Sequence, residues 1–482
     1  MPTRRLPSEP SLEHLRKEAK ALRRRHASGD ADAVALVQEL HPRAGELAEL
    51  KLADAQLVVA RSYGFPSWPR LRGYVETVER YAQPGGGEDG LVDRFLRLAC
   101  LTYAGDGPER RQAARELLAE HPELAAASIH TTAAVGDVAA AAEALARDPA
   151  QASLRGGPHD WEPLLYAAYS RLDLPEHSTL EVARLLLDHG ADPNAGWVGG
   201  WGPPPFTALT GAFGYGEDAP NQPPHEYELE LARLLLERGA DPNDGQTLYN
   251  NMWRRTDEHL ELLFAHGLGR GDGGPWQRRL APMIATPAQM LEDLLLFSAE
   301  GGGLGRVELL MAHGVDVNGL GTRHPTLHGR NALELALDNG HTQLAELLAA
   351  AGGVAAPFDP VEELLAACLR GDRDRVRELL VSDPALAAAA VARDPHRLLR
   401  AAELDRPDAV RLLVELGYDV NRGNAMHLAA YFGNRPMVEL LLDLGGDPNV
   451  RDPEFDATPA GWARHAHHDE LADFLDEREL SS

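Results

Sequence analysis

One sequence motif, called the phrase below, recurs along the chain and constrains its fold more than any other feature. It reads as an apolar helix end, a glycine, and then aspartate and asparagine, and its copies are Ala183–Asn194, Ala232–Asn243, Val307–Asn318, Val438–Asn449 and a less regular Val410–Asn421. A unit that recurs must bury its apolar face against its neighbours. The repeat therefore predicts a stack of similar units, with function expected on an extended surface.

Each copy of the phrase has a mechanical interpretation. Val438, Leu441 and Leu442 have the i, i+3, i+4 spacing of an amphipathic helix. Gly445 follows at the point where a left-handed cap ends a helix, and Asp447-Pro448-Asn449 then prevents its continuation. The phrase thus predicts the second half of a helix, its end and an outward turn.

A shorter helical segment precedes the phrase and completes the unit. Examples are Asn424–Asn434, Asn331–His341 and Thr458–His465, the last with Thr458 as a cap and Pro459 in the first turn. With these segments the chain resembles an ankyrin-repeat protein, whose unit reads Thr-Pro-Leu-His-x-Ala-Ala, Gly, Val-x-x-Leu-Leu and Gly-Ala-Asp-x-Asn. The resemblance implies an all-α solenoid of helix–turn–helix–finger units.

The spacing of the phrase predicts an uneven array over residues 91–482. A variant that ends its helix in Asp-Pro, as at Asp148-Pro149 and Asp383-Pro384, fills long intervals and gives roughly ten repeats. Insertions are expected near 195–228 and 268–303. The sequence leaves open whether the degenerate segments 91–127 and 246–275 fold as full units or serve as caps and spacers.

Residues 1–83 predict a small helical module ahead of the array, and the Gly-rich stretch 84–90 predicts a linker. The expected helices begin at Ser11, span about Asp32–Leu40 and about Leu47–Tyr63, and follow Ser67. Together with Tyr63–Pro69, the segment resembles a helical leader found ahead of ankyrin arrays in bacterial proteins. Phe65 and Trp68 are expected in its core rather than in a binding patch.

Charge and composition narrow the class of partner. The 482-residue chain has a net charge of −27, but residues 1–80 carry 14 basic and 11 acidic residues, so the remainder carries −30. Such an acidic array disfavours nucleic acid and attracts a basic protein, although solubility alone also accounts for it. Cys100 and Cys368 lie too far apart for a disulfide framework. No secretory or membrane-spanning run is present, which predicts a cytoplasmic protein, and the arginine-over-lysine bias favours a bacterial source.

The sequence contains no familiar catalytic or cofactor motif. It has no Gly-rich loop followed by Lys-Ser/Thr, no Gly-x-Ser-x-Gly and no His-Glu-x-x-His. Gly267–Gly274 and Gly301–Gly305 are interpreted as connections. His465–Asp469 is the densest set of metal-ligand side chains, but it is interpreted as a turn before the last helix. We therefore expect no catalytic residue, cofactor or metal.

The stretch 194–276 is the strongest candidate for a binding surface. Enlarged loops there replace an ordinary finger and separate the helices of one repeat, and loops on rigid scaffolds carry many binding residues. Its candidate partner-binding residues are Trp197, Trp201, Phe206, Tyr215, Tyr249, Trp253 and Arg254. The alternative is that these aromatics pack the loops down. The surface interpretation predicts that Trp197→Ala and Trp201→Ala abolish partner capture with a nearly unchanged melting temperature.

These patterns favour a scaffold that binds another protein without catalysis. The competing interpretation is a hydrolase-type enzyme, which requires a nucleophile and a base within hydrogen-bond reach in the inserted loops. A third is a regulator or antidote of a co-transcribed effector, which differs from a scaffold only in its partner. The sequence leaves the partner and the oligomeric state open.

Overall fold

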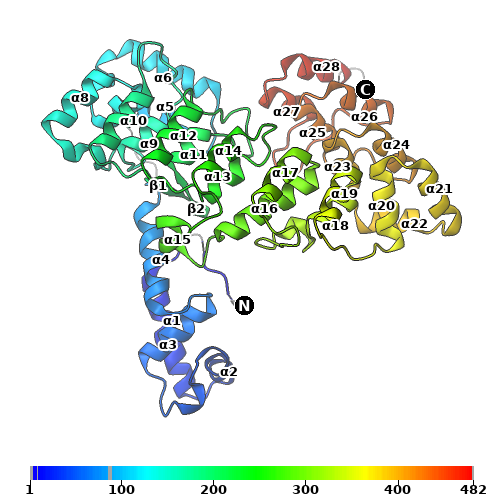
Figure 1. Cartoon of the computed structure of the whole chain (residues 1–482), viewed down its shortest axis with the longest axis horizontal. Coiled ribbons are helices and arrows are strands. Elements are labelled where there is room, and N and C mark those ends of the chain that lie inside the picture. Colours follow the sequence, from blue (N-terminus) through cyan, green and yellow to red (C-terminus); the bar gives the residue numbers. More distant parts are fainter. Residues whose placement is uncertain (1–3, 8, 85–89, 480–482) are drawn as a thin grey trace. The chain divides into compact units, whose positions relative to one another are not determined.

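The fold is built almost entirely of helices, as the repeat predicts (Figure 1). The computed structural model describes residues 4–7, 9–84 and 90–479, so most of the predicted linker lies outside the described residues. The chain forms two compact units, Met1–Met290 and Leu291–Ser482. None of the helices in the described ranges is long and apolar enough to cross a lipid bilayer.

The N-terminal module contains four α-helices, and a short 3₁₀ turn separates the second from the third. They are α1 (Leu12–Ala27), α2 (Ala31–Leu40), α3 (Leu52–Ser62) and α4 (Trp68–Tyr81). The Ser11 side chain caps α1 as expected. The third helix begins at Leu52, later than predicted, because the backbone N–H of Lys51 donates to the Asp54 carboxylate at 3.0 Å and fixes its start there. Ser67 occupies the N-cap position of α4 without a side-chain hydrogen bond.

The module shares its hydrophobic core with the inserted region of the array. Phe65 is buried, as expected, and Trp68 packs against the same cluster, which also includes Val198, Trp276 and Leu280. The Arg70 guanidinium donates to the carbonyl of Arg278 at 3.2 Å. The module therefore packs on the array within the first unit.

Pairs of helices follow the module in the first unit. They are α5 (Leu91–Ala99) and α6 (Pro108–Glu120), α7 (Ile129–Val135) and α8 (Val138–Arg147), α9 (Pro163–Tyr169) and α10 (Thr179–Asp188), α11 (Ala208–Phe213) and α12 (Glu228–Glu237), and α13 (Gly245–Asn250) and α14 (Glu258–Ala265), before α15 (Gly274–Leu280). The first helices of successive pairs contact one another from α7 to α13. Both degenerate segments, 91–127 and 246–275, contain a helix pair. The helix α16 (Pro287–Gly301) spans the boundary between the units.

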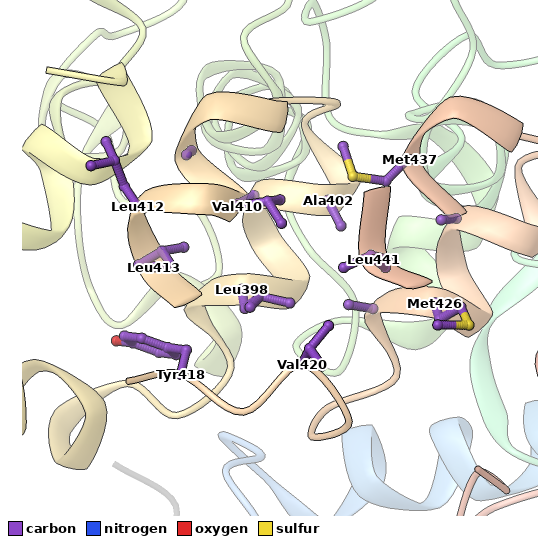
Figure 2. Packing of buried hydrophobic residues seen from close by; sticks show 14 of the residues in the cluster. Leu398, Ala402, Val410, Leu412, Leu413, Tyr418, Val420, Met426, Met437 and Leu441 are labelled. Carbon is purple, nitrogen blue, oxygen red and sulfur yellow. The ribbon is translucent and has the colours of Figure 1, made fainter. Parts of the chain in front are cut away.

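The same helical arrangement continues in the second unit. Its helices are α17 (Leu304–Ala312), α18 (Ala332–Asp338), α19 (Thr342–Ala350), α20 (Pro360–Arg370), α21 (Arg373–Ser382), α22 (Leu386–Arg393), α23 (Arg397–Glu403), α24 (Pro407–Glu415), α25 (Ala425–Tyr431), α26 (Arg435–Asp443), α27 (Pro459–His465) and α28 (Asp469–Glu479). Leu398, Val410, Leu413, Met437 and Leu441 interlock between neighbouring pairs (Figure 2). These are the apolar positions of the repeated pattern, so the repeat supplies the core.

The asparagine that closes the phrase links one repeat to the next. Asn194 Oδ1 accepts from the backbone N–H of Asp241 at 2.9 Å, and its Nδ2 donates to the carbonyl of Gly239 at 3.0 Å. Asn421 makes the same two contacts with Asp447, at 2.7 Å, and with Gly445, at 3.3 Å. The phrase therefore stops a helix and also fixes its spacing from the following unit.

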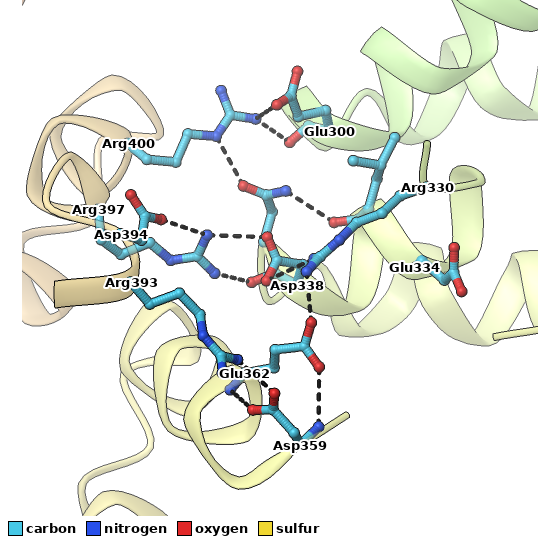
Figure 3. A network of polar contacts seen from close by, with 12 residues as sticks. Glu300, Arg330, Glu334, Asp338, Asp359, Glu362, Arg393, Asp394, Arg397 and Arg400 are labelled. Carbon is cyan, nitrogen blue, oxygen red and sulfur yellow. Dashed lines mark hydrogen bonds and ion pairs between the residues drawn. The ribbon is translucent and has the colours of Figure 1, made fainter. Parts of the chain in front are cut away.

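A partly buried ionic network joins three helices of the second unit (Figure 3). Arg397, with only 6% of its side chain exposed, pairs with Asp338 at 3.0 Å, and Asp338 also pairs with Arg330 at 3.0 Å. Burial opposes ionisation of Asp338, but the two guanidinium groups outweigh it and lower its pKa. Arg330 also forms an ion pair with Glu362, on α20, at 2.8 Å. The network thus joins α18, α20 and α23.

Candidate interaction surface

The first inserted loop forms the one sheet of the described residues, a hairpin that an all-α expectation does not include. Strand β1 (Gly196–Gly199) pairs antiparallel with β2 (Gly202–Thr207), and Trp197 lies opposite Phe206. The main chain of β1 also approaches the N-terminal module, where Val198 forms a bridge with Ala82. The hairpin replaces an ordinary finger between α10 and α11.

The hairpin buries two of the candidate binding residues. Trp197 and Phe206 are each only 2% exposed, and their rings stack at 4.5 Å between centroids. Trp161, from the preceding repeat, stacks on the other side of Trp197 at 5.4 Å. As the alternative interpretation predicts, these two rings pack the loop down. They do not offer a surface, and the expectation that Trp197→Ala leaves the melting temperature unchanged is revised accordingly.

Trp201 lies in the hairpin turn and stays accessible. Its side chain is 54% exposed, while its ring contacts Trp197 and Phe206 at centroid distances of 6.5 and 5.7 Å. The buried pair supports the ring from beneath. Trp201 therefore combines a fixed position with an open face, as interface anchors do.

The second inserted loop contacts the turn that follows α13. The guanidinium of Arg254 lies over the ring of Tyr215, with Cζ 4.5 Å from the centroid. The same guanidinium pairs with the Glu228 carboxylate, one contact being Nη2 to Oε2 at 3.3 Å. Arg254 is mostly buried between these two groups, so it joins the inserted loop to α12 and to the turn.

Tyr249 and Trp253 present the most open aromatic surface of this region. Their rings meet edge to face at 5.3 Å, and they are 36% and 53% exposed. The Tyr249 hydroxyl donates a hydrogen bond to the carboxylate of Glu217 in the inserted loop. Partial burial, with the Glu217 contact, raises the pKa of Tyr249, so it remains a neutral donor.

Local sequence patterns do not indicate the residue that anchors the second inserted loop. Arg171 is 1% exposed and donates to the carbonyls of Pro223 at 2.8 Å and Gly211 at 2.6 Å. It also donates to Ser170 and Ala168 at 2.7 and 3.1 Å, so its partners are all carbonyls near helix ends and in the loop. Burial lowers the pKa of Arg171. Its role follows from tertiary contacts that local sequence patterns do not show.

A half-buried tyrosine lies between the hairpin and the second inserted loop. Tyr103, in the loop between α5 and α6, contacts Phe206 of the hairpin at 4.7 Å. Gly216 of the second loop lies close to the same ring, since a Cβ atom added to this glycine would be 3.4 Å from Tyr103. Tyr103 therefore packs between the hairpin and the second loop, and it is a second residue that sequence reasoning missed.

A hydroxyl–imidazole pair of the kind that a hydrolase uses joins α10 to the second inserted loop, but only its imidazole belongs to the inserted region. The Thr179 hydroxyl lies 2.9 Å from Nε2 of His225, and Nδ1 of His225 accepts from the backbone N–H of Tyr227 at 3.1 Å. Burial, aided by the Arg171 charge, lowers the pKa of His225 to about 3. Both side chains are buried, at 5% and 3% exposure, so no substrate reaches this pair without opening the loop. The pair holds α10 to the inserted loop.

A small cavity lies beside the hairpin, and its size bears on ligand binding. It is lined by Pro204, Asp244, Trp276, Gln277 and Met290, among others, and its volume is about 30 Å³. Asp244 is buried there as the cap of α13 and accepts from the hydroxyl of Thr210 at 3.2 Å. A space of this size holds one or two water molecules and no organic substrate.

Comparison with known proteins identifies the repeats in both units. Residues 364–475 match a family model described as ankyrin repeats in three copies, and residues 159–196 match the model of a single ankyrin repeat. No curated protein matches the chain significantly. The first match covers the regular helix pairs of the second unit, and the second ends where the hairpin begins.

Proposed function

Because the chain is an ankyrin-repeat protein, we propose that it binds another protein through the exposed aromatics of its inserted loops, without covalent chemistry. The contact residues are the exposed rings of Trp201 on the hairpin and of Tyr249 and Trp253, and Tyr215 and the mostly buried Arg254 lie beside them. We call them together the inserted-loop surface. Ankyrin repeats are interaction modules in general. The inserted loops add exposed aromatic side chains to this array.

The observation that carries the proposal is that the exposed rings are held in place before any partner arrives. Trp201 rests on the buried Trp197–Phe206 pair, Tyr249 bonds to Glu217, and Arg171 anchors the loop beneath. Fixed aromatic side chains lose little conformational entropy on binding. Flexible loops that served only as spacers would not need this support.

Two further parts of the proposal concern the partner and the location. The array is strongly acidic, which favours a basic protein by electrostatic steering. Cys100 and Cys368 are both buried and free, which is consistent with a cytoplasmic location.

A regulator that holds a toxic effector would use the same surface and is the second candidate function. A hydrolase is less well supported, because the hydroxyl–imidazole pair is buried.

Affinity capture from cells of the source organism tests the proposal. The bait is the full chain, compared with the W201A/W253A double variant and with L154A as a matched control. Leu154 lies in the same unit and is 52% exposed, close to Trp253 at 53%. We expect one protein to be recovered with the wild type and with L154A, and lost with W201A/W253A at an unchanged melting temperature. Equal recovery with all three baits would exclude the inserted-loop surface.

A further inference from the structure

A second set of aromatic rings, two exposed and two half-buried, lies in the last repeats, away from the inserted loops in sequence. Tyr431 ends α25 and Phe432 follows it, Trp462 lies on α27, and Phe455 lies on the finger before α27. The ring of Trp462 is 6.1 Å from those of both Tyr431 and Phe455, and Tyr431 is 5.4 Å from Phe432. We call these four residues the C-terminal aromatic surface.

Two of these rings are unusually open to solvent. Phe432 is 57% exposed and Phe455 is 66% exposed, whereas every other phenylalanine of the chain is at least partly buried. Exposed phenylalanines that adjoin further aromatic rings mark interaction sites more often than a single exposed apolar residue does. Neither side chain belongs to the hydrophobic core cluster of the second unit, so both are available for contact with a ligand.

The finger holds Phe455 in a fixed position through one buried carboxylate. Asp452 is 2% exposed and accepts hydrogen bonds from the backbone N–H groups of Phe455 at 2.7 Å and Ala457 at 3.0 Å. It also accepts from Nε1 of Trp462 at 3.0 Å. Against the cost of burial, these donors lower the pKa of Asp452 to about 2. The carboxylate therefore orients Phe455 and Trp462 together.

A buried histidine supports the central ring from beneath. His427 is 1% exposed, and its ring lies 5.6 Å from that of Trp462. Its Nε2 lies 3.0 Å from the carbonyl of Val450 and 3.2 Å from that of Ala457, on the two sides of the finger. The half-buried Trp462 ring is therefore fixed by His427 and Asp452.

Charge around this surface selects the chemistry of its ligand. From Asp443 to Glu479 the sequence has eleven acidic and three basic residues. The three bases already have partners within the chain: Arg464 pairs with Asp476 at 2.6 Å, Arg478 stacks on Phe474 at 3.5 Å, and Arg451 pairs with Asp456 at 3.6 Å. Aromatic faces and surplus carboxylates both attract cations, and arginine combines with both.

We propose that the C-terminal aromatic surface binds an arginine-rich segment of a partner protein. The guanidinium groups stack on Phe455, Trp462 and Phe432, and the surrounding carboxylates neutralise their charge. This site is independent of the inserted-loop surface, because its residues belong to the second unit. It gives the chain a second binding activity with a defined ligand chemistry.

Fluorescence anisotropy with the full chain tests this binding. The probe is a fluorescein-labelled peptide of alternating arginine and glycine, compared with a peptide of alternating glutamate and glycine. We expect only the arginine peptide to bind, and F432A/F455A to weaken it about tenfold, the scale of lost cation–π contacts. V381A is the matched control, because Val381 is 78% exposed in the same unit. Its affinity, like that of W253A, should equal the wild-type value.

Four results would overturn the proposal. The first is no binding of the arginine peptide at low salt, and the second is equal affinity for wild type and F432A/F455A, which would leave only long-range charge attraction. The third comes from sedimentation velocity of the chain alone: a self-association abolished by F432A/F455A would identify a second copy as the occupant. Loss of binding in W253A with retention in F432A/F455A would likewise place the peptide on the inserted-loop surface.

Discussion

The Cζ atom of Arg254 lies 4.5 Å from the centre of the Tyr215 ring. This contact joins the second inserted loop to the turn after α13, and the pairing of Arg254 with Glu228 extends the connection to α12. Three segments that are separate in sequence are therefore held together at one partly buried guanidinium. The accessible Trp253 lies directly before Arg254 in this turn, and Tyr249, which it contacts, lies near the end of α13.

Arg254→Met should loosen the second inserted loop. The substitution keeps an unbranched apolar stem but removes the ion pair and the ring contact, so amide hydrogen exchange across residues 214–224 should accelerate while that of α9 and α10 stays unchanged. The control is Arg255→Met, because Arg255 is the exposed neighbour. Equal exchange in both variants would show that the contact does not order the loop.

The two hairpin tryptophans should differ sharply in their effect on stability. Trp197→Ala leaves a cavity between Trp161 and Phe206 and should cost about 3–5 kcal/mol of unfolding free energy. Trp201→Ala removes a ring that is 54% exposed and should cost no more than about 1 kcal/mol. Urea unfolding followed by circular dichroism measures both, and similar losses would contradict the hairpin packing.

The repeat was predictable from the sequence because its signals are local. The phrase around Gly445 contains its own helix stop, and Gly445 adopts the left-handed φ of +94° that the cap requires. The Asp-Pro variant also ends α8 and α21 by a local signal, but with an extended Asp148 or Asp383 before the proline instead of a left-handed glycine. The resemblance to the ankyrin unit is confirmed by the family matches in both units.

The hairpin and the burial of its rings were not predictable in this way. Pro203, Pro204 and Pro205 argue against a strand, since proline lacks the N–H that pairs strands, yet they lie in the edge strand β2. Trp197 is buried by Trp161, a residue of the preceding repeat, and its sequence neighbours do not indicate this contact. Sequence composition identified the aromatic region, and only tertiary packing separates its buried rings from its exposed ones.

His225 should make the first unit less stable in mild acid. Burial lowers the pKa of His225 to about 3, whereas the unfolded chain has the usual value of about 6.5. The unfolded state therefore takes up a proton between these two pKa values, and the folded state does not. The contribution of neutral His225 to the free energy of unfolding is thus complete above pH 6.5 and is lost as the pH falls toward 3. At pH 5 the loss is roughly 2 kcal/mol.

Comparison of the wild type with His225→Gln isolates this effect. Glutamine retains a donor and an acceptor near Thr179 and Tyr227 but does not titrate, so the fall in stability between pH 7.5 and pH 5 should be smaller by roughly 2 kcal/mol. Urea unfolding at the two pH values measures the difference. An identical fall in both proteins would mean that His225 titrates normally in the folded chain.

The central claim is that the exposed aromatics of the inserted loops touch a partner protein, and photo-crosslinking in cells of the source organism tests it most directly. A benzophenone amino acid is placed at position 253, at position 201, or at position 154 as the control, in an otherwise unchanged chain. We predict one adduct of the same mass and identity at positions 253 and 201 and none at position 154. The absence of an adduct at both tryptophan positions, or an equal adduct at position 154, would contradict the claim.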